Sequence, residues 1–168
     1  MPRKPEKKQK NGFTLMEIIV VIGVIISVLT STMVLISMTV NSTKASRLKI
    51  TAISLSQEGL EIVRNIRDNN WLADRRNIAN WRFGLAPGDY RVQYDSLSLI
   101  SFASVSLSLI NGYYQYGAGI STPFYRRITL EHLNDNQLRV VSEVSWEEKE
   151  RRQEISAETR LYNWLEEN

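Results

Sequence analysis

Glu17 is the residue of this sequence best placed to do unusual chemistry, because it stands at the head of a long uncharged segment. No residue from position 18 to position 43 carries a charge, which is a run of 26 residues. A helix of that length rises about 39 Å, enough to cross the hydrocarbon core of a bilayer. An unpaired carboxylate is costly in lipid. Glu17 is therefore a candidate functional residue.

Few other residues suggest chemistry. His132 is the only histidine, so no second imidazole exists to complete a familiar metal site or triad, and a packing or surface role is expected. The chain has no cysteine, which excludes a disulfide framework and a thiol nucleophile. Four oxygen-bearing residues could suggest a calcium loop: Asp68, Asn69, Asn70 and Asp74. Their spacing does not match an EF-hand loop, and a helix stop explains them better.

No catalytic constellation emerges from the remaining residues. No glycine-rich loop resembles a phosphate cradle, and the serine-rich stretch at residues 104–108 has no partnering base. We therefore expect a protein that is not an enzyme and that has no catalytic residue, cofactor or metal site.

The basic character of the chain belongs to its first residues. The formal net charge is +3, but residues 1–12 hold five of the 21 basic residues and only one of the 18 acidic residues. A basic flank before an apolar span fits the positive-inside rule and predicts a cytoplasmic N-terminus. A basic tail that binds nucleic acid is the less favoured alternative. We expect residues 1–12 to be an unstructured leader and find no direct nucleic-acid site.

The period of the apolar residues changes after position 43. In residues 44–67 they recur at spacings of three and four, which predicts an amphipathic helix. No proline lies between Pro5 and Pro87, so residues 13–43 and 44–67 can form one helix of about 80 Å. Gly59 is expected to mark a close contact. The predicted packing stripe consists of Ala45, Leu48, Ala52, Leu55, Gly59, Ile62 and Ile66, widened by Ile53, Leu60 and Val63.

The second half of the chain, residues 68–168, predicts strands. The helix is expected to stop at residues 68–70, and aromatic residues of the following connection are expected to cover a core. Alternating apolar positions predict strands over residues 90–94, 97–109, 127–133, 138–146 and 155–161, with a turn-rich loop at 111–119 and a charged hairpin tip at 147–152. One long helix packed on an antiparallel sheet gives an α+β fold.

The N-terminal motif resembles a known processing signal. The basic leader and the apolar run flank six residues that look like the class III signal of type IV prepilins and type II secretion pseudopilins: Gly12, Phe13, Thr14, Leu15, Met16 and Glu17. The resemblance implies that a prepilin peptidase cuts between Gly12 and Phe13, that the new amino group of Phe13 is methylated, and that the leader is removed. It also implies a pilin-like fold.

The same resemblance implies how the mature chain acts. It would be an inner-membrane precursor, embedded in lipid with its N-terminus cytoplasmic, that an inner-membrane assembly platform adds to an extracellular or periplasmic filament of pilin or pseudopilin subunits. Glu17 of one subunit would meet the Phe13 amine of a neighbour and set the register. Whether the chain is a major or a minor subunit, and whether it serves a pilus, secretion or DNA uptake, stays open.

Two other functions stay open at this point. The chain can be a single-pass, membrane-anchored binding module that is neither processed nor polymerised, and then Glu17 lies at the headgroup level of an ordinary anchor. A membrane-tethered enzyme is the third hypothesis, which the missing catalytic constellation disfavours.

Overall fold

The computed structural model describes residues 12–73 and 81–163. It contains one helix, α1 (Leu15–Ala73, 59 residues), and a seven-stranded sheet whose paired strands are all antiparallel. The predicted α+β fold is confirmed. The chain divides into two compact units, residues 1–44 and 45–168.

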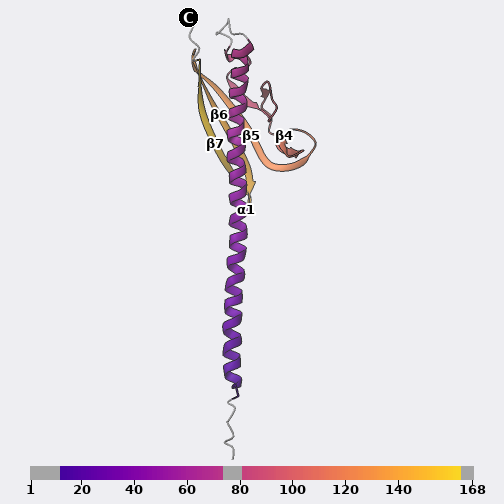
Figure 1. Ribbon diagram of the computed structural model, residues 1–168, viewed down its shortest axis with the longest axis vertical. Helices are drawn as coiled ribbons and strands as arrows, with labels where there is room; N and C mark the ends of the chain where they lie inside the picture. The colour runs from indigo at the N-terminus through magenta and orange to yellow at the C-terminus, as the bar shows by residue number, and fades with distance from the viewer. Residues whose placement is uncertain (1–11, 74–80, 164–168) are drawn as a thin grey trace, which may run out of the picture. The chain divides into compact units, whose positions relative to one another are not determined.

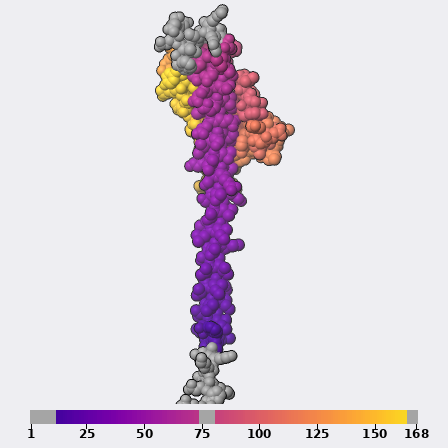
Figure 2. All heavy atoms as spheres, in the orientation of Figure 1, coloured from indigo at the N-terminus to yellow at the C-terminus, as the bar shows by residue number. Residues whose placement is uncertain are grey.

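The described part of the first unit is the N-terminal part of α1. Its apolar side chains are exposed and form the indigo and purple surface in Figure 2. Seven hydroxyl side chains donate to the carbonyl oxygen four residues before them, at 2.8–3.0 Å. Such bonds satisfy polar groups within the helix, which suits an apolar environment. These residues are Ser27, Thr30, Ser31, Thr32, Ser37, Thr39 and Thr43.

Strand β5 is the centre of the sheet. It pairs along one edge with β6, which in turn pairs with β7. Along its other edge it pairs first with β3 and then with β1, because its 15 residues are long enough to hold both. The strands are β1 (Gly88–Arg91), β2 (Ile100–Ser101), β3 (Ser106–Ile110), β4 (Tyr113–Gln115), β5 (Ile120–Asn134), β6 (Gln137–Glu148) and β7 (Arg151–Tyr162).

The second half of α1 covers one face of this sheet, and Figure 1 shows it crossing β5 and β6. The apolar stripe of the helix and the alternate residues of the strands form two core clusters. One contains Ala52, Leu55, Leu107, Phe124, Val144 and Trp146. The other contains Leu60, Ile62, Val63, Ile66, Trp71, Trp81, Leu85, Val92, Ile128, Leu130, Leu138, Val140 and Leu161.

Helix and sheet approach most closely at Gly59. A Cβ atom built on Gly59 would collide with Ser142 Oγ and would lie 2.8 Å from Ile128 Cδ1. One turn earlier, Ser56 Oγ donates to the carbonyl oxygen of Ser142 at 2.7 Å. Glycine therefore allows the helix backbone to come close enough for this buried hydrogen bond.

Arg126 of β5 fixes the same contact with a buried charge. Its side chain is fully buried, and its Nη1 donates to the carbonyl oxygen of Leu55 at 3.1 Å and to Glu58 Oε1 at 3.2 Å. Its Nη2 donates to the carbonyl oxygen of Val92 at 2.6 Å. One guanidinium thus joins the helix, the segment after β1 and the central strand.

The helix ends later than the sequence predicts. Asn69 and Asn70 do not stop it, because the Asn69 side chain bonds to Asn65 at 2.8 Å and the Asn70 side chain reaches the carbonyl oxygens of Trp81 and Phe83. Trp71 adds a buried ring that stacks on Trp81, with centroids 6.4 Å apart. Tertiary packing therefore extends α1 to Ala73. The two tryptophans cover the core as expected, but Phe83 is 75% exposed.

The predicted strand over residues 97–109 is wrong in its middle. Only residues 100–101 and 106–110 are strands, and Leu97 of the predicted inward face is 80% exposed. The predicted loop at 111–119 contains strand β4, because Asn111 and Gly112, both with positive φ, form a tight hairpin turn. The final hairpin is longer than predicted, and its loop is only Lys149 and Glu150.

We expect Gly59→Ala to destabilise the sheet unit by about 1–3 kcal/mol, because overpacking forces the helix away from β6. Thermal unfolding followed by circular dichroism measures the change. Gly23→Ala is the matched control, since a Cβ atom there meets nothing within 4 Å. An unchanged melting temperature for Gly59→Ala would show that the contact yields without loss.

Candidate functional site

The predicted processing site precedes the helix. Gly12 and Phe13 are both exposed, and the Phe13 side chain is 79% exposed. Neither residue belongs to α1, which begins at Leu15. The peptide bond between them is therefore accessible and outside regular structure. The rest of the predicted leader, residues 1–11, lies outside the described residues.

Glu17 lies in the first turn of α1, where it has a local role that the sequence analysis missed. Its backbone N–H donates to Thr14 Oγ1 at 3.3 Å, so Thr14 caps the helix and Glu17 takes the third helical position. This spacing, Thr-x-x-Glu, is the signature of a capping box. The signal was present in the sequence. Glu17 also carries a negative charge at the positive end of the helix dipole, which is favourable.

The residues of the predicted packing stripe differ in how far they are buried. Five of its members are buried, namely Ala52, Leu55, Gly59, Ile62 and Ile66. Ala45 and Leu48 are only half-buried, and Leu48 packs against the first core cluster. Of the three residues expected to widen the stripe, Leu60 and Val63 are buried, but Ile53 is 39% exposed.

The other candidate residues have structural partners. The Nε2 atom of His132 lies 2.8 Å from the carbonyl oxygen of Leu85, which fixes the segment before β1. Asp68 accepts from Arg67 Nε at 2.6 Å. Asp74 lies outside the described residues. Within residues 12–73 and 81–163, no group of three acidic or histidine side chains is placed to hold a metal ion.

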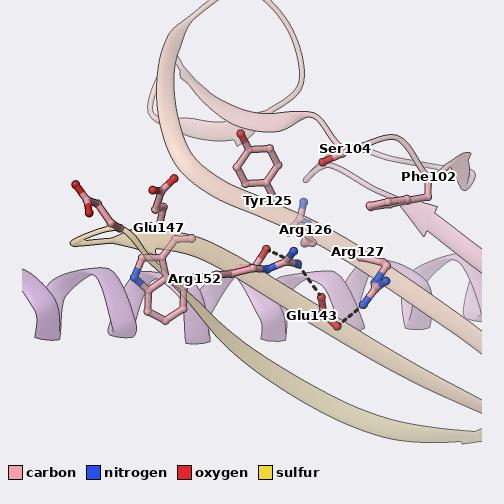
Figure 3. A pocket seen from close by; sticks show the side chains of 11 residues that line it. Phe102, Ser104, Tyr125, Arg126, Arg127, Glu143, Glu147 and Arg152 are labelled. Atoms are coloured by element: carbon pink, nitrogen blue, oxygen red, sulfur yellow. Dashed lines mark hydrogen bonds and ion pairs between the residues drawn. The ribbon is translucent and has the colours of Figure 1, made fainter.

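A cavity of about 520 Å³, which the sequence did not predict, lies on the far side of the sheet from α1. It lies where β5 leaves β6, since pairing of the two strands begins only at Tyr125 and Ser145. The segment 102–105 forms one wall, and the β6–β7 hairpin forms the other. Figure 3 shows the side chains that line it.

A row of ion pairs lies in this cavity. Glu143 is only 15% exposed and stands between two arginines (Figure 3). Its Oε2 accepts from Arg127 Nη2 at 2.6 Å, and its Oε1 lies 3.7 Å from Arg152 Nη2. The same Arg152 nitrogen donates to Ser145 Oγ at 3.2 Å. The hydrogen bond to Glu143 raises the pKa of Arg127 above its ordinary value.

The hairpin tip beside the cavity is strained. Lys149 and Glu150 form a two-residue loop with φ values of 51° and 61°. Both central residues of such a turn favour Asn and Gly, as at Asn111 and Gly112, and a side chain there costs about 1 kcal/mol or more. Glu150 is nevertheless one of the residues that line the cavity.

Comparisons with protein-family models, with curated proteins and with solved structures give no match for this chain.

We expect Lys149→Asn to raise the melting temperature of the sheet unit by a few degrees, because Asn tolerates the left-handed conformation. Calorimetry on the full chain measures the shift. Glu148→Asn is the control, because Glu148 is paired in β6 and gains nothing from such a change. An equal or lower melting temperature for Lys149→Asn would mean that the turn is not strained in solution.

Proposed function

We propose that this protein is a structural subunit of a type IV pilus or related pilin-like filament, in the minor pilin or pseudopilin class. One observation carries the proposal: an exposed Gly12–Phe13 bond stands two residues before a helix that begins with Glu17 in its first turn and continues as an apolar, exposed segment. That order of features is what a processed, polymerising helix requires. The subunit has no enzymatic activity in this proposal.

The apolar part of α1 supports a precursor that is embedded in a membrane. α1 contains a segment long and apolar enough to span a bilayer, with none of that segment buried in the chain itself. We place this precursor in the bacterial inner membrane with the basic leader in the cytoplasm, since basic flanks stay on that side. The sheet unit then lies outside, and the mature chain passes into an extracellular or periplasmic filament.

Cleavage changes the electrostatics of the helix start. A cut after Gly12 creates a positive amine on Phe13, one residue before the Thr14 cap. The positive end of the helix dipole and a positive amine repel one another, so the amine gains from any nearby carboxylate. Staggered parallel helices bring the Glu17 of one subunit to the amine of the next, and a subunit out of register leaves a buried charge unpaired.

The alternative function is a single-pass anchored binding module that is neither processed nor polymerised. The exposed apolar helix is equally compatible with such an anchor. The mass of the N-terminal peptide separates the two, because only the filament subunit loses residues 1–12.

We expect Gly12→Val to block processing, because the peptidase must admit the backbone at the cut and a branched side chain prevents this. Mass spectrometry of the membrane fraction should then find a precursor that retains its 12 leader residues. Gly23→Val is the control, since it changes a glycine far from the cut that has open space around it. Normal maturation of Gly12→Val would contradict the signal assignment.

We expect Glu17→Val to be inserted and cleaved but to enter filaments poorly, because the apolar run and leader charges drive insertion while Glu17 serves assembly. Glu17→Asp should be intermediate. Glu17→Gln gives Thr-x-x-Gln, which is also a capping-box spacing, but it removes the charge. This variant should therefore resemble Glu17→Val. The measurement is the ratio of filament-associated to membrane-associated protein.

Thr14→Ala is the control for the local role of Glu17. It removes the cap, at a cost of about 1 kcal/mol, but keeps the carboxylate. Thr14→Ala should assemble well if the charge pairs subunits. Equal ratios for Glu17→Val and the unchanged protein would remove the register role.

A further inference from the structure

We infer that the cavity between β5 and the β6–β7 hairpin binds a neutral saccharide chain. Its volume of about 520 Å³ falls within the range of small-molecule sites, which is about 300–1,000 Å³. It is built entirely from the sheet unit, so this inference does not depend on processing or polymerisation.

The charges of the cavity favour a neutral ligand. Glu143 is only 15% exposed, whereas Arg127 and Arg152 are 39% and 70% exposed, so this group of three presents mainly positive charge and repels cations. The rim of the cavity holds Glu147 and Glu150, both exposed, and therefore repels phosphates, sulfates and carboxylates. Arg126 does not change this balance, because its guanidinium group faces α1 and is paired with Glu58.

The ion-pair row supplies ready hydrogen-bonding groups. Guanidinium and carboxylate groups each present two atoms side by side, which matches the neighbouring hydroxyls of a sugar ring. Because Arg127 donates to Glu143 at 2.6 Å, these two groups lose little conformational freedom when a ligand binds.

Two exposed rings complete the site. Tyr125 is 42% exposed and Phe102 is 40% exposed, and in Figure 3 both lie on one side of the ion-pair row. The guanidinium of Arg127 lies 5.9 Å from the centre of the Phe102 ring and helps to orient it. The backbone N–H of Phe102 is held by the carbonyl oxygen of Asp89 at 3.1 Å. The apolar C–H face of a sugar ring stacks on such rings, while its hydroxyls face the polar row.

The test uses the full chain in detergent micelles and six hexasaccharide probes. Maltohexaose, cellohexaose, mannohexaose and chitohexaose are neutral, oligogalacturonate is anionic, and the chitosan hexamer is cationic. Calorimetric titration and saturation-transfer NMR should detect at least one neutral probe with a Kd of about 1 mM or tighter. The two charged probes should bind more weakly than that neutral probe.

Matched variants locate the binding. Tyr125→Ala should weaken binding about tenfold, whereas Tyr94→Ala, which removes a tyrosine of nearly equal exposure (43%) outside the cavity, should leave it unchanged. Arg152→Leu should weaken binding, and Arg160→Leu on the same strand should not. The inference is overturned if no neutral probe binds, if a charged probe binds more tightly, or if Tyr125→Ala and Tyr94→Ala bind alike.

Discussion

The close approach of α1 to β6 at Gly59 is the contact on which the sheet unit depends. It brings the helix backbone near enough for Ser56 to donate to the carbonyl oxygen of Ser142. The two core clusters lie on either side of this point, one around Leu55 and one around Ile62. A side chain at position 59 would push the helix residues of both clusters away from the sheet. The lack of a side chain at Gly59 therefore supports the whole core.

Arg126 shows how the same contact tolerates a buried charge. Removing a guanidinium from water costs several kcal/mol unless its donors are paired. Here Glu58 supplies the opposite charge, and two backbone carbonyl oxygens accept hydrogen bonds from Nη1 and Nη2. The hydroxyl of Tyr116 is buried nearby; burial raises its pKa, and the charge of Arg126 opposes that rise. Replacing Arg126 by an apolar residue would leave Glu58 and both carbonyl oxygens without their partner.

The helix and the last hairpin could be predicted because their patterns are local. A stripe at spacings of three and four identifies the buried side of α1, and alternation from Leu138 to Trp146 identifies the inner face of β6. The ends of the strands between residues 97 and 119 could not be predicted. Serines and apolar residues alternate along this segment, although part of it lies outside the sheet. Tertiary contacts with Trp81 likewise extend the helix beyond its asparagines.

The candidate sites divide in the same way. The Gly12–Phe13 motif and the spacing of Thr14 and Glu17 are contiguous, so they are visible in the sequence even where the capping role was overlooked. The cavity is not visible in the sequence, because Arg127, Glu143 and Arg152 come from three strands. These residues meet only through the register of β5, β6 and β7. Position 126 falls one residue before the predicted strand, so no alternation marked Arg126 as inward-facing.

In the proposed filament, Glu17 would have both a local role at the start of the helix and a role in assembly. Before cleavage it needs only the Thr14 cap and the helix dipole, both of which α1 provides by itself. Cleavage would leave the cap intact, since Thr14 remains in the mature chain, but it would add a positive amine at Phe13. The carboxylate would then gain a partner that did not exist in the precursor. A single proteolytic step would thus give a residue of the capped first turn a role in assembly without any change in the fold.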